Sequence, residues 1–224
     1  GRFTPLLRIG QWLRPLLPAA LRHKVPKAKS AARPTALPVT DRRVLVLEGC
    51  VQPGLAPEIN QALETVLHRL GISVQHAPDA GCCGALPHHL SDTRRAREMA
   101  RRNIDAWYPA LEAGAEAVVV TASGCGAHLQ DHPALLADDP AYASKAVRLK
   151  ELVRDPLQIL AQESLDGLRL RPRQARLAVH TPCTLQHALT LNGATEKLLA
   201  TLGYELCTVE EGHLCCGSAG LPAL

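Results

Sequence analysis

Aromatic residues and long apolar runs are both scarce in this sequence. One Phe, two Trp and three Tyr among 224 residues leave few rings on which nucleic-acid bases could stack. No apolar run approaches the ~18 residues that span a bilayer as a helix. The sequence also has no secretory signal, no glycine-rich nucleotide-binding loop and no evident acid–base pair. We therefore expect no transmembrane helix and no catalysis by the chain alone.

Acidic residues are nearly missing from the first 43 residues. This segment holds ten Lys or Arg and one acid, Asp41, whereas residues 44–224 carry a net charge of −5. The positive charge therefore lies outside the folded body, and we expect no nucleic-acid partner. Six prolines divide the segment into short amphipathic helices and a linker. We predict a basic, proline-rich leader over residues 1–43 that packs loosely on the body, with a transit peptide or membrane-surface contact as alternatives.

The placement of cysteine is the most informative feature of the chain. A lone Cys, a gap of 31 residues and Cys-Cys-Gly occur in this order twice, and one more Cys lies in TASGCGAH at 121–128. Thiolates are metal ligands, so a repeated arrangement of them favours a metal centre, and iron–sulfur above all. The seven candidate ligands are Cys50, Cys82, Cys83, Cys125, Cys183, Cys215 and Cys216.

The two Cys-Cys pairs bear on whether the cysteines form disulfides, bind a metal or act as reactive thiols. Two neighbours make a poor disulfide with each other, and a helix-rich body indicates an intracellular protein with reduced thiols. Neighbouring thiolates fit a multi-iron cluster more easily than one tetrahedral zinc ion, which is an alternative together with reactive-thiol chemistry. Cys207 lies within the apolar run YELCTV and is interpreted as structural.

Most of the other unusual side chains are interpreted as structural. Among the histidines, His180, His213, His88 and His89 are assigned to structural or loop positions, and His128 is an additional ligand candidate. Trp107 and Tyr108 are expected to pack in the core or against a partner.

In each copy of the cysteine pattern, the sequence predicts a strand, a helix and a second strand. The run VLVLEG (44–49) predicts a strand that ends at Cys50, residues 59–70 have one apolar face of a helix between Pro57 and Gly71, and ISVQHA (72–77) predicts a second strand. The second copy repeats this with strands at 176–180 and 204–209 and a helix over 188–202. Between the copies we expect a helix at about 90–113, a strand at 115–122 and helices near 141–165.

This order predicts an α/β fold with parallel sheets, in two related Rossmann-like halves. The lone cysteines follow strand ends, so we expect them to converge at the carboxyl edge of a sheet. We place the first repeat at residues 44–170 and the second at 171–224. The chain ends seven residues after Gly217, so the second repeat is expected to be incomplete.

Several of these segments resemble a known family. EGC (48–50), AGCCG (80–84), TASGCG (121–126), PCTLQH (182–187) and HLCCGSAG (213–220) resemble the cysteine-rich CCG domain of iron–sulfur oxidoreductases. NIDAWYPALEAGAEA (103–117) and TPCTLQHA (181–188) are similar to the iron–sulfur subunits of glycolate oxidases within that family. The resemblance covers residues 44–224.

The resemblance implies an electron-transfer subunit of an oxidoreductase that acts on the CH–OH group of 2-hydroxy acids. Flavoprotein partners that bind FAD would oxidise glycolate to glyoxylate, and this chain would carry electrons through 4Fe–4S clusters. The family's usual ferredoxin-like domain, with its Cys-x2-Cys-x2-Cys run, is absent from this sequence. A cytoplasmic location, or a peripheral one at the inner face of the plasma membrane, would follow.

The resemblance also assigns the ligands to two motifs. Cys50, Cys82, Cys83 and Cys125 would form the first, and Cys183, Cys215 and Cys216 the second. The heterodisulfide-reductase relatives add a Cys-x-x-Cys pair, but Ala122 and His128 stand where Cys125 would find its partner. A noncubane cluster, a four-thiolate cubane cluster, a structural zinc ion and an empty site therefore stay open, as does lactate in place of glycolate.

Overall fold

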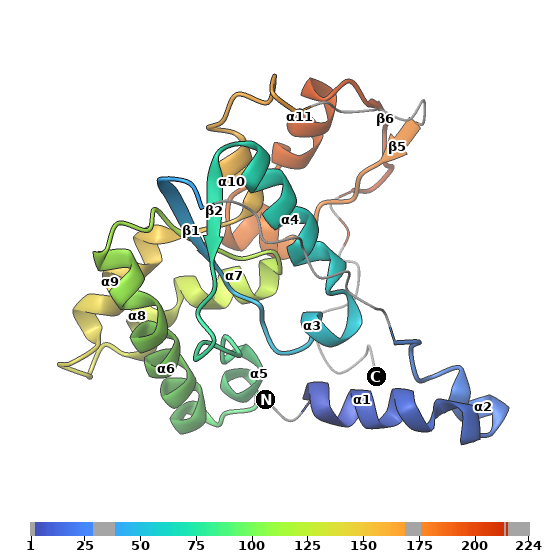
Figure 1. Ribbon diagram of the computed structural model, residues 1–224, viewed down its shortest axis with the longest axis horizontal. Helices are drawn as coiled ribbons and strands as arrows, with labels where there is room; N and C mark the ends of the chain where they lie inside the picture. The colour runs from blue at the N-terminus through green and yellow to red at the C-terminus, as the bar shows by residue number, and fades with distance from the viewer. Residues whose placement is uncertain (1–2, 29–38, 169–175, 213, 215–224) are drawn as a thin grey trace.

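Short buried strands alternate with amphipathic helices along the chain, as the sequence predicts. The computed structural model describes residues 3–28, 39–168, 176–212 and 214 (Figure 1). The strands are β1 (Arg42–Val46), β2 (Ile72–Gln75), β3 (Val118–Val119), β4 (Val153–Arg154), β5 (Arg176–Ala178) and β6 (Glu205–Cys207). The main helices of the body are α4 (Glu58–Arg69), α6 (Thr93–Glu112), α7 (Ser123–Gln130), α9 (Ala143–Leu152) and α11 (Ala194–Thr201). Shorter helices are α3 (Gln52–Leu55), α5 (Ala85–His89), α8 (His132–Leu135), α10 (Pro156–Leu160) and the π-helix η2 (Thr184–Ala188).

Four strands form one parallel sheet in the order β2-β1-β3-β4. Arg42 of β1 lies opposite Ile72 of β2, and Leu45 lies opposite Val118 of β3. The chain leaves β1 toward β2 and then returns past β1 to form β3. This reversal creates a topological switch point between β1 and β3.

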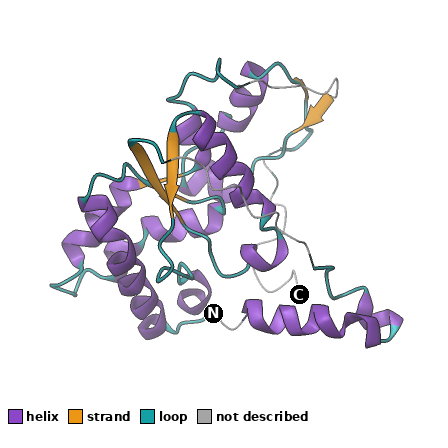
Figure 2. Cartoon of the chain, viewed as in Figure 1, coloured by secondary structure: helices purple, strands orange, loops and turns teal. Residues whose placement is uncertain are grey.

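The alternation of side chains along the strands builds a core on each face of the sheet. Val44 and Val46 of β1 point to the face covered by α4 and α10, together with Leu67 and Ile159. Leu45 points to the opposite face, which α6, α7, α8 and α9 cover. The result is three layers, with helices around the larger sheet (Figure 2).

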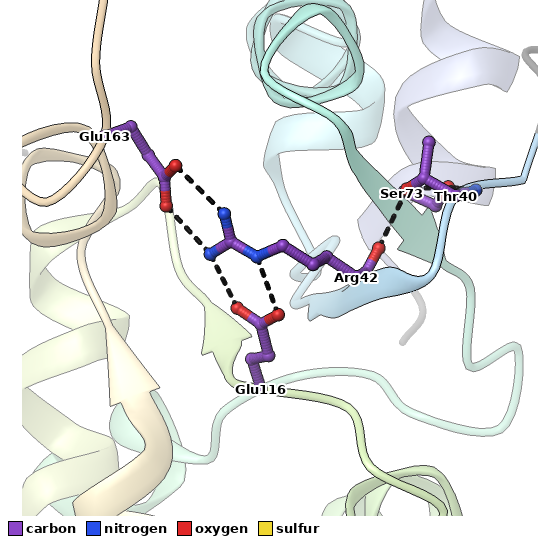
Figure 3. Close-up of polar contacts among 5 residues, drawn as sticks. All are labelled: Thr40, Arg42, Ser73, Glu116 and Glu163. Atoms are coloured by element: carbon purple, nitrogen blue, oxygen red, sulfur yellow. Dashed lines mark hydrogen bonds and ion pairs between the residues drawn. The ribbon is translucent and has the colours of Figure 1, made fainter.

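Ion pairs tie the amino edge of this sheet to the loops around it. Arg42, the first residue of β1, donates from Nε to Glu116 at 2.8 Å and from Nη2 to Glu163 at 2.8 Å (Figure 3). Both carboxylates raise the pKa of Arg42, chiefly through these hydrogen bonds. Thr40 N–H donates to Ser73 Oγ beside it, which joins the start of β1 to β2.

The second copy forms a separate unit with a two-stranded parallel sheet of β5 and β6 (Figure 2). α11 precedes β6, which repeats the strand–helix–strand order of β1, α4 and β2. The unit rests on the first through contacts of η2 with α7 and of α11 with α10. The predicted boundary between the repeats, at residues 170 and 171, falls outside the described residues and stays a prediction.

The leader contains the short helices that its prolines predict. α1 (Phe3–Leu13) is followed by the 3-10 helix η1 (Arg14–Leu16) and by α2 (Ala19–Arg22). Thr4 Oγ1 donates to the Cys50 carbonyl oxygen at 3.1 Å, so α1 lies beside the first cysteine loop. In the described residues, no helix is long and apolar enough to cross a membrane.

The long helix expected at about 90–113 is confirmed as α6, which begins at Thr93 because Asp92 accepts a capping bond from Arg95 N–H. Other local predictions are wrong. His88 and His89 belong to α5 rather than to a loop. The helix expected over 188–202 starts only at Ala194, because Gly193 takes a positive φ of 73°. The π-helix η2 (Thr184–Ala188), which the sequence pattern did not indicate, lies upstream of it and is separated from it by residues 189–193.

Candidate metal centre

The first set of cysteines gathers at the carboxyl edge of the four-stranded sheet, beside the switch point. Cys50 follows β1, the pair Cys82 and Cys83 follows β2, and Cys125 lies in the first turn of α7 after β3. Parallel strands bring their carboxyl ends to one edge, so residues 75 positions apart in sequence become neighbours. This part of the prediction is confirmed by the fold.

The four thiols contact one another in series. Hydrogen bonds join Cys50 to Cys82, Cys82 to Cys83 and Cys83 to Cys125. These contacts lower the pKa of Cys82 and Cys125 and raise the pKa of Cys50 and Cys83. Thiolate is the form of cysteine that binds a metal, and the lowered pKa of Cys82 and of Cys125 favours that form at these two positions.

Backbone hydrogen bonds hold the Cys82–Cys83 loop in place. Asn103 of α6 is fully buried; its Oδ1 accepts from Gly81 N–H at 2.9 Å and its Nδ2 donates to the Cys82 carbonyl oxygen at 3.0 Å. His132 of α8 donates from Nε2 to the Cys83 carbonyl oxygen at 3.1 Å. The carbonyl can only accept, so His132 carries its proton on Nε2 and leaves Nδ1 as a bare nitrogen.

A cluster of histidines lies behind this loop. The ring of His128 is 5.2 Å, centroid to centroid, from the rings of both His88 and His132. Burial lowers the pKa of His128 to about 4 and that of His132 to about 4. Gly84, at a φ of 95°, lies against His128 Nε2, and a Cβ there would come within 3.4 Å of that nitrogen. Both imidazoles are therefore neutral at pH 7.

The second motif adjoins the first through η2. Thr184, the residue after Cys183, donates from its hydroxyl to Ser123 Oγ at 2.7 Å, two residues before Cys125. Cys215 and Cys216 lie outside the described residues, so their role as second-motif ligands stays a prediction, as does the structural role expected for His213. His180 Nε2 donates to the Leu214 carbonyl oxygen at 3.0 Å, which fits the structural role expected for it, and Cys207 lies in β6 as predicted.

The donor set fits an iron–sulfur cluster better than a single ion. Among the described residues, no group of three or more His, Cys, Asp or Glu side chains is arranged to hold one metal ion. A tetrahedral zinc site needs four sulfurs arranged around one point. Each Cys of a cluster binds a different iron, so four cysteines from separate segments of the chain can serve as its ligands.

Sequence reasoning missed the residues that support the loop. Asn103 and His132 lie outside the cysteine motifs, yet the side chain of each forms hydrogen bonds with the backbone of the Cys82–Cys83 loop. Asn103 carried a signal, because it is a polar side chain on the buried face of α6 between Ala100 and Trp107. A buried Asn needs partners, and a loop that contains ligands is a natural place for them. Trp107 is fully buried in the core, as predicted.

Comparison of the sequence with known families agrees with this geometry. Residues 44–130 and 177–223 match CCG, the cysteine-rich domain, and the chain belongs to this family. The two matched segments are the two copies of the cysteine pattern.

Among individual proteins, the chain is 50% identical over 222 residues to the glycolate oxidase iron-sulfur subunit of Escherichia coli K12, which covers 99% of this chain and 54% of that protein. It is 31% identical over 215 residues to a protein of Bacillus subtilis 168 named "Probable glycolate oxidase iron-sulfur subunit", with 90% of this chain and 46% of that protein covered. A lactate utilization protein A of Exiguobacterium is 26% identical over 179 residues, with 76% of this chain and 69% of that protein covered. The chain thus spans about half the length of the first two relatives.

Proposed function

We propose that this chain binds an iron–sulfur cluster and transfers electrons within a glycolate-oxidase-type complex. The observation that carries the proposal is the contact of Cys50, Cys82, Cys83 and Cys125 at one sheet edge, although they come from three separate segments that follow β1, β2 and β3. The 50% identity to the E. coli iron-sulfur subunit supports the same assignment. A 4Fe–4S cluster is the proposed occupant, since four thiolates are its usual ligand number.

The side chains at this site would perform distinct tasks. Cys50, Cys82, Cys83 and Cys125 would bind the cluster, which supplies one-electron transfer when present. Asn103 would keep the backbone of Cys82 in place while the cluster gains or loses an electron. Cys183, with Cys215 and Cys216, would provide the ligands of the second motif.

The substrate chemistry is assigned to partner subunits. FAD in a flavoprotein partner would supply the two-electron oxidation of glycolate to glyoxylate, in which the carbon loses a hydride and the hydroxyl oxygen loses a proton to a base of that partner. The cysteines of this chain would hold the cluster that accepts those electrons one at a time. Lactate is the second candidate substrate, because a lactate utilization protein is among the relatives, at the lower identity of 26%.

We further propose a cytoplasmic position at the inner face of the plasma membrane. α1 carries an exposed apolar stripe with Leu6, Ile9 and Trp12, and the segment around it is rich in Arg and Lys. Helices with this distribution lie in the surface of anionic membranes.

Anaerobic reconstitution of the protein tests the cluster. The expected result is about four irons and four sulfides per first motif, with a broad visible absorption that dithionite bleaches. Changing Cys82 to Ser should remove this centre, whereas changing Cys207 to Ser, a cysteine in β6, should leave it. A colourless protein with one tightly bound zinc per motif would instead support the structural alternative.

A further inference from the structure

The guanidinium group of Arg102 rests against the backbone of the cysteine loop. A side-chain carbon built on Gly81 would lie 3.1 Å from Cζ of Arg102 and 3.7 Å from its Nη1, with Nη2 closer still. Gly81 directly precedes Cys82. The absence of a side chain at Gly81 therefore makes room for a cation beside the first-motif ligands.

No carboxylate of the described residues neutralises the positive charge of Arg102 in an ion pair. Arg101, the preceding residue of α6, pairs with Asp139 at 2.7 Å. Arg102 forms no ion pair with any of the described residues, although Asp79, Glu98 and Asp105 line the same shallow hollow of about 410 Å³. Its positive charge contributes to the lowered pKa of Cys82, after the larger effect of the Cys50 and Cys83 hydrogen bonds.

We propose that Arg102 is an electrostatic positioning residue that raises the reduction potential of the centre bound by Cys82. This inference rests on the proposed cluster. It assigns to a residue outside the cysteine motifs a part in setting the reduction potential of that cluster. Reduction brings one electron, and hence one negative charge, to the cysteine loops. The donor, a reduced flavin or dithionite, loses that electron, no bond breaks, and Arg102 stays protonated in both states.

A nearby positive charge favours the more negative, reduced state. Arg102 is exposed at the surface, so water and salt screen part of its effect. We expect its removal to shift the reduction equilibrium by about tenfold, which is about 59 mV for a one-electron couple. The shift should shrink at ~1 M salt, where the screening length falls to about 3 Å.

Redox titration of the cluster-loaded protein, followed by its visible spectrum and by electron paramagnetic resonance, tests the proposal. Arg102→Gln should lower the midpoint potential, and Arg102→Lys, which keeps the charge, should restore most of it. Gly81→Ala should also lower the potential, because its methyl group displaces the flexible end of Arg102 while the fold is kept. Arg101→Gln is the matched control, since it removes the neighbouring cation that pairs with Asp139.

The outcomes separate this inference from the proposed function. A wild-type protein that holds no iron refutes the cluster itself. A loaded protein whose potential is the same in wild type, Arg102→Gln and Gly81→Ala overturns the role of Arg102. An equal decrease in Arg101→Gln also overturns it, because the effect would then come from net charge. If Arg102→Gln does not load iron, the midpoint potentials of Gly81→Ala and Arg102→Lys are compared with that of the wild type. A lower potential in Gly81→Ala than in Arg102→Lys supports the role of Arg102, and equal potentials overturn it.

Discussion

The two copies of the cysteine pattern have the same local elements but different burial. In the first, β1, β3 and their helices enclose side chains that are completely buried, among them Leu67 and Trp107. Across the described residues 176–212, Thr181 is the one buried side chain. Strand β5 and helix α11 therefore form as their sequence predicts without producing a core of their own.

This contrast shows that a local sequence pattern specifies helices and strands, whereas the burial of their apolar faces depends on how many strands the sheet has. A helix needs one apolar face to form against a strand, but that face is fully covered only when a sheet is broad enough and helices lie on both sides. The first unit has four strands and two cores, whereas the described second unit has two strands. Stability should accordingly be concentrated in the first unit.

The largest effect is expected from a pair of equivalent leucines. Leu67 of α4 and Leu199 of α11 each stand four residues before the glycine that follows their helix, Gly71 and Gly203. Leu67→Ala should destabilise the protein by about 2–5 kcal/mol, the usual result for a fully buried Leu. Leu199→Ala should cost about 1 kcal/mol or less because the side chain is only partly buried. Urea unfolding measures both, and equal losses would contradict the contrast.

A pair of asparagines extends the comparison to the metal centre. Asn103 is buried and binds the Cys82 loop, whereas Asn192 is exposed in the second unit. Asn103→Ala leaves two backbone groups unpaired, which should cost about 1–3 kcal/mol. It should also weaken iron retention by about 10–100-fold, as losses of ligand-supporting contacts commonly do. Iron per chain after exposure to a chelator measures this, and Asn192→Ala should match the wild type.

Much of the first unit can be predicted from its sequence. The apolar runs of β1 and β2 and the apolar face of α4, with Pro57 and Gly71 at its ends, have the periods of a buried strand and an amphipathic helix. The cysteine positions after strands then predict their convergence, because parallel strands share a carboxyl edge. These predictions depend on local patterns that the tertiary structure does not override.

Other features have no local signal. β4 has two residues, Val153 and Arg154, and exists because it pairs with β3. The late start of α11 follows the positive φ of Thr190 and Gly193, and the π-helix η2 has no periodic signal in the sequence. The contact of Arg102 with Gly81 requires the turn of α6 to be placed against the cysteine loop. Such features arise from long-range packing, which periodicity does not encode.

The histidines provide a test based on pH. Burial lowers the pKa of His128 to about 4 in the folded protein, whereas an unfolded His has a pKa of about 6.5. The unfolded state therefore binds more protons between these values, so stability should fall as pH decreases from about 6.5 to about 4, by up to about 1.4 kcal/mol per pH unit for this group. His128→Gln should flatten that slope in urea titrations. His187→Gln, at an exposed position in η2, should not.

The smallest effect is expected at the amino edges of the two sheets. Arg42 begins β1 and bonds to Glu116 and Glu163. Arg176 begins β5 and, within the described part of the chain, pairs with Glu205 alone, at 3.0 Å between side chains that are 67% and 68% exposed. A network holds a side chain in place more effectively than a single exposed pair, which is screened by solvent. Arg42→Gln should cost about 1 kcal/mol and Arg176→Gln about 0.3 kcal/mol at most. Thermal unfolding at low and high salt checks both, since the Arg42 effect should shrink with salt. If Arg176→Gln proved the more damaging change, the greater stability assigned to the first unit would not extend to its surface.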